Sequence, residues 1–282
     1  MPSASFTIAN GDTAPADRSS VLAQRIISAL VLIPLALGGV FLGPPYLDGL
    51  VVLFALAMGW EWVRVCHRGR FVPSGLVVLL AAAGSIVAYR VGGLAAALIV
   101  LAAGALAAGL VAEAGIRLWH ALGAVYVGLP CLAMLWIRGD AQPGLDTLLW
   151  TLVLVWSVDT GAYLAGRSIG GPKLAPSISP KKTWAGFAGG LLAAALVGAL
   201  GARWLGLQGW WLLAAIGAVL AVIEQAGDLA ESAFKRRFGV KDSSNLIPGH
   251  GGVLDRVDGL LAVLVAVAGL MIVTKGGVRT WQ

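Results

Sequence analysis

The chain has 282 residues, of which 59% are hydrophobic and only 12% are charged, with a formal net charge of +6. Soluble domains carry about 25% charged residues, so this composition excludes a soluble enzyme. The apolar residues occur in runs of about 20, the length at which a helix crosses a bilayer. Such continuous runs also exclude a transmembrane barrel. We therefore predict an all-α, polytopic helical membrane protein.

The polar segment 1–20, which contains Pro2 and Pro15, is predicted to be a disordered cytoplasmic tail. It lacks the short apolar core and cleavage site of a signal peptide. About nine membrane spans are predicted, near residues 24–43, 47–63, 72–89, 93–113, 118–137, 146–165, 185–202, 209–227 and 257–274. About five of them form an N-terminal transmembrane region, 21–145, and the rest belong to a region expected to be catalytic, 146–282.

The distribution of Lys and Arg indicates the orientation of these spans. With the N-terminus inside, 15 of the 20 Lys and Arg residues fall on the inner side. Because these residues favour the cytoplasmic side of a membrane, we predict a cytoplasmic N-terminus. The same orientation puts both long polar loops, 166–184 and 228–256, on the cytoplasmic face, where they can form one site.

The loop 166–184 follows a span that an acid interrupts. Asp159 lies within an apolar run of more than ten residues, and an ionisable residue there is a functional candidate. The alternative is a packing acid paired with an arginine. Further on, the segment SPKKT, 179–183, places two cations and two hydroxyls on a turn, which suits phosphate oxygens. An ordinary basic cytoplasmic loop is the alternative.

The end of the span 209–227 carries a second set of polar residues. Asp228, Glu231, Ser232 and Lys235 have the spacing i, i+3, i+4 and i+7, which puts them on one side of a continuing helix. The alternative is a solvated helix end with a Glu231–Lys235 ion pair. One turn deeper lies Glu224, and an acid at that depth is costly unless it has a partner.

The most polar stretch is 232–258, SAFKRRFGVKDSSNLIPGHGGVLDRVD, in which five cations accompany three carboxylates on a glycine-rich backbone. This combination suits a metal-bound polyphosphate. Asp255 and Asp258 open the last span, where a helix N-terminus favours negative charge. Asp228 and Asp255 could share a divalent cation such as Mg²⁺. The glycines around His250 favour close approach to a ligand, although an ordinary loop histidine is the alternative.

Together these segments resemble the phosphatidate cytidylyltransferase family (CDP-diacylglycerol synthases). The stretch 232–258 fits the long motif of that family, and the G-D-L-x-E-S and D-T-G-A-Y to S-P-K-K-T segments are also similar. The detailed resemblance covers about residues 155–260. One position departs from the pattern, because Ala185 stands where the family usually has Glu, so no carboxylate role carries over to it.

The resemblance implies that CTP and phosphatidic acid react to give CDP-diacylglycerol and pyrophosphate, with Mg²⁺ held by Asp228 and Asp255. It also implies that K⁺ assists, that the protein forms a homodimer, and that it lies in a bacterial-type inner membrane with the site facing the cytoplasm. The expected partners are therefore CTP, phosphatidic acid and the lipid bilayer, with no nucleic acid. A CTP-dependent lipid kinase and a membrane transporter are the alternatives, although transporters carry broken helices repeated in two halves, which we do not find.

The expected site residues fall into two groups. Catalytic roles are expected for Asp228, Asp255, Asp258, Lys241 and His250. Substrate-binding roles are expected for Asp159, Ser179, Lys181, Lys182, Thr183, Ser232, Lys235, Arg236 and Arg256.

Overall fold

The computed structural model describes residues 18–139 and 142–281, in which the chain forms eight α-helices and one two-stranded hairpin. The helices are α1 (Arg18–Leu42), α2 (Tyr46–Cys66), α3 (Leu76–Val111), α4 (Arg117–Arg138), α5 (Gln142–Ser168), α6 (Trp184–Trp204), α7 (Trp210–Arg237) and α8 (Leu254–Thr274). The antiparallel strands are β1 (Lys173–Ala175) and β2 (Ser179–Thr183). The all-α prediction is confirmed, and the small hairpin is an addition to it. Of the predicted tail, residues 1–17 lie outside the described residues.

Within the described residues, seven helices are long and apolar enough to cross a membrane, so the chain is an integral membrane protein. α1 adds a shorter apolar segment, Leu30–Leu42. α3 is broken at Gly93, which has a φ of 73°, a conformation that glycine adopts without steric cost. Its two arms run antiparallel and pack against each other, with Gly104 of one arm against Ala81 of the other. The nine predicted spans thus match α1, α2, the two arms of α3, and α4 to α8.

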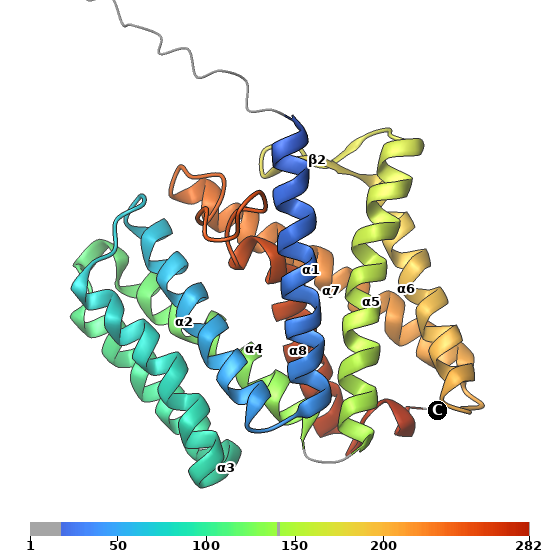
Figure 1. The fold of residues 1–282 in the computed structure, drawn as a ribbon, viewed down its shortest axis with the longest axis horizontal. Helices are drawn as coiled ribbons and strands as arrows, with labels where there is room; N and C mark the ends of the chain where they lie inside the picture. Colours follow the sequence, from blue (N-terminus) through green and yellow to red (C-terminus); the bar gives the residue numbers. More distant parts are fainter. Residues whose placement is uncertain (1–17, 140–141, 282) are drawn as a thin grey trace, which may run out of the picture.

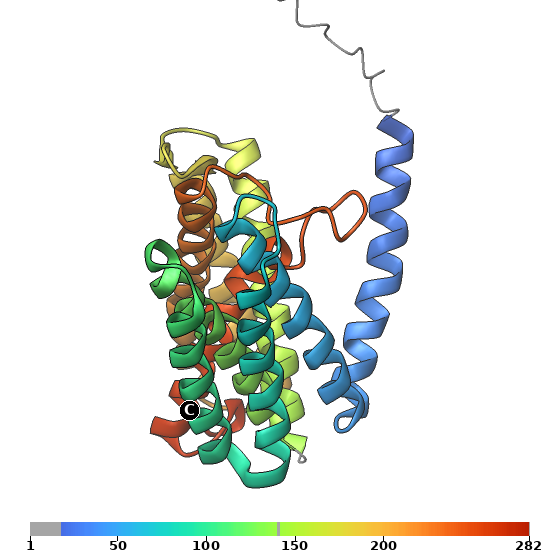
Figure 2. The ribbon, with the colours of Figure 1, turned by 90° about the vertical axis from the view of Figure 1, so that its left-hand side faces the viewer.

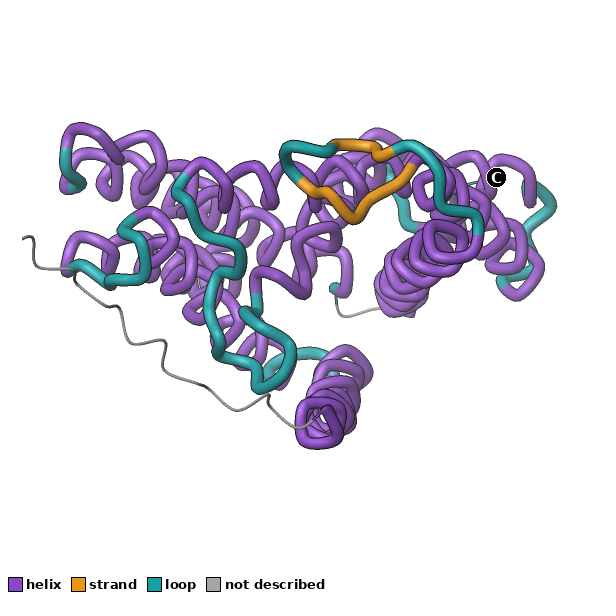
Figure 3. Tube along the Cα trace, turned by 90° about the horizontal axis from the view of Figure 1, so that it is seen from above, coloured by secondary structure: helices purple, strands orange, loops and turns teal. Residues whose placement is uncertain are grey.

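The chain passes back and forth so that both long polar loops lie at the same end of the helices (Figure 1). This end carries the hairpin, the loop 238–253 and the N-terminal end of α1. The turn after α1, the turn between α6 and α7, and the C-terminal segment lie at the opposite end. Figure 3, a view onto the loop-bearing end, shows the hairpin lying across the helices. The prediction that the two polar loops share one face is confirmed.

Glycines let the helices that carry the site pack closely. A Cβ added to Gly189 of α6 would lie 2.3 Å from the Ala165 Cβ of α5, and one on Gly198 would lie 2.3 Å from the Leu213 carbonyl oxygen of α7. Small residues at such contacts are typical of membrane helices. α8 packs against both α7 and α4, and so connects this group to α2 and α3 (Figure 1).

α1 lies at the side of the molecule and diverges from the other helices toward its N-terminal end (Figure 2). The loop 238–253 reaches toward it, and the Ser28 hydroxyl donates a hydrogen bond of 3.1 Å to the Pro248 carbonyl oxygen. Large apolar side chains on α1, such as Leu30 and Leu35, are exposed. They are suited to contact lipid.

Candidate active site

A cavity of about 300 Å³ lies at the loop-bearing end, between α5, β2, α6 and α7. We call it the α5–α7 cavity. Its lining includes five of the predicted site residues: Asp159, Lys181, Lys182, Thr183 and Asp228. Residues of β2 and of α7, which are far apart in the sequence, therefore contribute to one cavity.

Lys182 joins β2 to α7. Its ammonium nitrogen lies 2.6 Å from Asp228 Oδ2 and donates a hydrogen bond of 2.8 Å to Gln225 Oε1. The next residue, Thr183, caps α6, because its hydroxyl oxygen accepts a hydrogen bond of 3.0 Å from the Gly186 N–H. The cap defines where β2 ends, and so it fixes the position of Lys182 over α7. Nothing in the sequence identifies Gln225 as a partner of Lys182.

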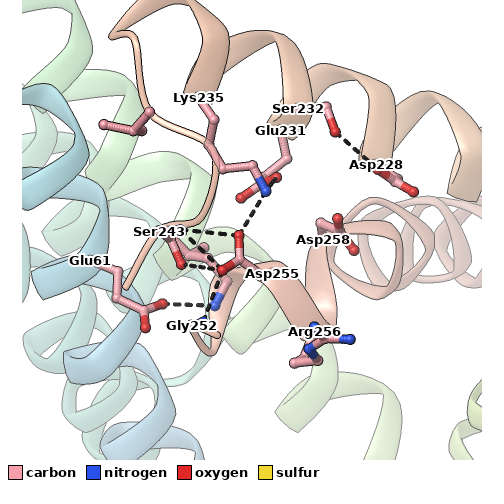
Figure 4. Close-up of polar contacts among 12 residues, drawn as sticks. Glu61, Asp228, Glu231, Ser232, Lys235, Ser243, Gly252, Asp255, Arg256 and Asp258 are labelled. Carbon is pink, nitrogen blue, oxygen red and sulfur yellow. Dashed lines mark hydrogen bonds and ion pairs between the residues drawn. The ribbon is translucent and has the colours of Figure 1, made fainter. Parts of the chain in front are cut away.

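Three more carboxyl groups lie near Asp228 of this ion pair. Asp159, Glu224, Asp228 and Asp258 are electrostatic neighbours, and Figure 4 shows Asp258 of α8 beside Asp228 of α7. Glu224 is only 2% exposed, and its Oε2 has no hydrogen-bond partner among the described residues. Gly259 makes room for it, since a Cβ there would lie 2.5 Å from Glu224 Oε1. Carboxyl oxygens gathered in this way are suited to a cation.

Asp255 lies in a separate set of contacts. Its carboxylate accepts hydrogen bonds from Lys235 Nζ at 2.7 Å, Gly252 N at 2.8 Å and Ser243 N at 3.0 Å. Lys235 also pairs with Glu231 at 2.5 Å. These contacts tie the loop 238–253 to α7 (Figure 4). The Glu231–Lys235 pair named in the sequence analysis is present, and it forms part of a larger buried group.

The two carboxylates expected to bind metal therefore have different partners, Lys182 for Asp228 and Lys235 for Asp255. Among residues 18–139 and 142–281, no group of three or more His, Cys, Asp or Glu side chains could hold a metal ion. Mg²⁺ commonly uses one or two carboxylates together with substrate phosphates and water. The donor chemistry near Asp228 and Asp258 fits that pattern. Both oxygens of Asp228 and both of Asp255 already have partners, since Asp228 pairs with Lys182 and accepts a hydrogen bond from Ser232, and Asp255 accepts from Lys235 and Gly252.

Glu61 of α2 is a site component that the sequence analysis missed. It is fully buried and accepts hydrogen bonds from Val253 N at 2.9 Å, Leu254 N at 2.8 Å and the Ser244 hydroxyl at 2.5 Å. It thus caps α8 from a distant helix. Gly252 leaves the necessary space, because a Cβ there would lie 2.7 Å from Glu61 Oε1. The sequence did offer one sign of its importance, because Glu61 is an acid inside the predicted membrane span 47–63.

The remaining predicted residues are not among those that line the α5–α7 cavity. Ser232 donates a hydrogen bond of 3.3 Å to Asp228. Arg236 donates to the Val240 carbonyl at 3.1 Å and Ser179 lies half-buried on β2. Arg256 donates through Nε and Nη2 to the carbonyl oxygen of His250, the Nε bond being 2.9 Å long.

Lys241 lies elsewhere on the same face. It lines a polar pocket of about 310 Å³ together with Arg64, Ser243 and Asn245. We call this the Arg64 pocket. Lys241 is not among the residues that line the α5–α7 cavity. The two polar cavities of this face therefore give two places where an anionic group could bind.

Residues 23–274 match the Cytidylyltransferase family. A relative from Pseudomonas aeruginosa, named phosphatidate cytidylyltransferase, is 40% identical over 268 residues, which cover 89% of this chain and 97% of that protein. A relative of the same name from Brucella suis is 39% identical over 245 residues, covering 86% of this chain and 90% of the other. The match, the lengths covered and the motifs agree, and the chain belongs to the cytidylyltransferase family.

Proposed function

We propose that this protein transfers the cytidylyl group of CTP to phosphatidic acid, producing CDP-diacylglycerol and pyrophosphate. The observation that carries the proposal is the contact between Lys182 and Asp228, which joins the hairpin to α7 beside a cavity of about 300 Å³. The names of the relatives support the choice of substrates. The site faces the cytoplasm of a bacterial inner membrane, where soluble CTP meets a lipid phosphate, and the excess of Lys and Arg on this face supports that orientation.

In the reaction, an oxygen of the lipid phosphate forms a bond with the α-phosphorus of CTP while the bond from that phosphorus to pyrophosphate breaks. The chemistry needs alignment and charge neutralisation, and no protein nucleophile. Lys181 and Lys182 on β2 neutralise phosphate oxygens in the α5–α7 cavity. Arg256 pairs with the lipid phosphate, and the Thr183 cap keeps the two lysines in position.

Asp228 and Asp255 are the proposed Mg²⁺ ligands, and Asp258 supports the cation. Bound Mg²⁺ supplies positive charge against the triphosphate oxygens. To hold the ion, Asp228 must give up its ion pair with Lys182, and Asp255 must give up hydrogen bonds from Lys235 and Gly252. Asp258 makes no ion pair within the described part of the chain. We also propose that K⁺ assists and that the protein acts as a homodimer.

The test uses purified protein in liposomes that contain phosphatidic acid, with CTP labelled on the α- or the γ-phosphorus. The proposal predicts Mg²⁺-dependent entry of the α-label into lipid and recovery of the γ-label as pyrophosphate. Transfer of the γ-label to lipid with release of CDP would identify a kinase. Folded protein that binds CTP but transfers neither label to phosphatidic acid would contradict the proposed acceptor.

A further inference from the structure

A second cavity, of about 180 Å³, lies within the membrane-spanning part of the molecule, between α1, α2, α4, α5 and α8. We call it the α1–α8 cavity. Its walls are apolar and include Leu37, Phe54, Met134, Trp156 and Leu260. Arg256 is the only charged side chain among the described residues that line it. An apolar cavity with a single cation is suited to an anionic molecule with a hydrocarbon chain.

Both cavities are lined by residues of α5. Trp156 lines the α1–α8 cavity, and Asp159, about one turn further along α5, lines the α5–α7 cavity. Arg256 is an electrostatic neighbour of Asp159, and Asp258 lies beside Asp228. Arg256 therefore lies at the boundary between the apolar cavity and the cavity that contains Lys182.

The apolar cavity extends away from this boundary along α8. Its lining residues on that helix run from Arg256 to Leu264, a distance of about 12 Å at 1.5 Å per residue. The cavity therefore begins at a cation near the loop-bearing end and continues into the membrane. A lipid has the same order, with its phosphate at the interface and its chains in the hydrocarbon layer.

The outer wall of the α1–α8 cavity comes from α1, which contributes Ala36, Leu37 and Val40. α1 diverges from the other helices toward its N-terminal end (Figure 2). Leu35, two residues from Leu37, is 52% exposed on the outer surface of the helix. A single peripheral helix thus separates the cavity from the surrounding lipid.

We propose that the α1–α8 cavity binds an acyl chain of the phosphatidic acid substrate while Arg256 binds its phosphate at the boundary with the α5–α7 cavity. This rests on the proposed function, to which it adds a lipid subsite. Nε and Nη2 of Arg256 donate to the His250 carbonyl oxygen, and the guanidinium carries further N–H donors, including those on Nη1, that can bind a phosphate oxygen. A chain seated in the cavity positions the phosphate oxygen toward CTP, so the subsite acts on long-chain lipids and contributes little to short-chain ones.

The first test compares Leu37→Trp, which fills the cavity, with Leu35→Trp, which adds the same side chain to the exposed face of α1. We expect Leu37→Trp to raise the KM for a long-chain phosphatidic acid about tenfold, equivalent to about 1.4 kcal/mol of binding free energy. For the same variant, turnover of dihexanoyl phosphatidic acid, which has short chains, should stay within about twofold of wild type. This measurement controls for folding. Leu35→Trp should change neither. Equal effects on both substrates, or equal effects of both variants, would overturn the proposal.

A second test does not depend on turnover. Wild-type protein in liposomes is irradiated with phosphatidic acid that carries a diazirine in its acyl chain, and the labelled peptides are mapped. We expect labelling of Leu260, Met134 and their neighbours that long-chain phosphatidic acid competes away, weaker labelling in Arg256→Gln, and less labelling by the matching phosphatidylcholine. Equal labelling by phosphatidylcholine would overturn the lipid subsite. If this labelling pattern holds but no CDP-diacylglycerol forms, the proposed function fails and the subsite stands.

Discussion

Lys182 and Asp228, which are held 2.6 Å apart, join the β-hairpin to α7. Each lies in one of two polar segments on the same face of the membrane helices, and together they line the α5–α7 cavity. The pair supplies a cation for phosphate beside a carboxylate for a metal ion, the two groups that nucleotidyl transfer requires.

Replacing Lys182 with Met should lower kcat/KM for CTP by about tenfold to hundredfold, because a hydrogen bond to a charged group contributes about 1.5–3 kcal/mol. The matched control is Lys173→Met, at an exposed residue of β1 in the same hairpin. It should leave kcat/KM within about twofold of wild type. Equal losses in the two variants would show that general positive charge on the hairpin matters and not the position of Lys182.

The carboxylates beside Lys182 can be separated by their response to metal. Asp228→Asn should lower turnover at least about hundredfold and raise the Mg²⁺ concentration needed for half-maximal rate, since a metal ligand is lost. Asp258→Asn should raise the Mg²⁺ requirement with a smaller loss of maximal rate. An Asp228→Asn enzyme with near-normal turnover and Mg²⁺ dependence would contradict the metal assignment.

Asp255 and Lys235 should show strong energetic coupling. Their side chains are only 7% and 10% exposed, and removing one partner of a buried ion pair costs about 3–5 kcal/mol. Asp255→Ala should therefore lower the midpoint of thermal denaturation in detergent as well as abolish turnover. Adding Lys235→Met to Asp255→Ala should cost less than the sum of the single changes. Additive losses would show that the pair does not act as a unit.

Glu61 should be required for the position of α8. Glu61→Ala leaves two backbone N–H groups and the Ser244 hydroxyl without their acceptor, at about 1–3 kcal/mol for each buried donor left unsatisfied. We expect lower thermal stability and loss of turnover, with partial recovery in Glu61→Gln, which keeps one acceptor oxygen. Glu113→Ala, on an exposed turn, serves as the control. Wild-type stability in Glu61→Ala would contradict this role.

Chelation of divalent cations should stop transfer without unfolding the protein. No metal-holding group of three side chains is present in the described part of the chain, so the ion is expected to depend on substrate phosphates for its remaining ligands. With EDTA, the circular dichroism spectrum and denaturation midpoint should stay unchanged while labelled lipid disappears. A large fall in the midpoint would indicate a structural metal site within the protein itself.

Hydropathy and charge distribution predict much of the fold because a membrane imposes a strong length requirement on its helices. The two polar loops lie on the same face because two predicted spans, 185–202 and 209–227, separate them in the sequence. The break in α3 is less accessible, since Gly93 is one of 39 glycines. The hairpin is equally difficult to predict, because β2 has only five residues and depends on contacts with α7.

The site is predicted more completely in its residue types than in its pairings. Lys182 and Asp228 both belong to recognised motifs, but their contact requires the three-dimensional arrangement of β2 and α7. Asp255 forms an ion pair with Lys235, although the sequence suggested that it shares a cation with Asp228. This pairing depends on the path of the loop 238–253. Glu61 lies 192 residues before the backbone N–H of Val253 that it binds, so local spacing carries no information about this contact.

The most direct test of the account asks which cavity binds the nucleotide. Wild-type protein is irradiated with a photoreactive CTP analogue in the presence of Mg²⁺, with and without excess CTP, and the labelled peptides are identified. The account predicts CTP-protected labelling of β2, the adjacent part of α5 and the Gln225–Asp228 segment, all at the α5–α7 cavity. Protected labelling confined to the Arg64 pocket, around Arg64 and Lys241, would contradict it.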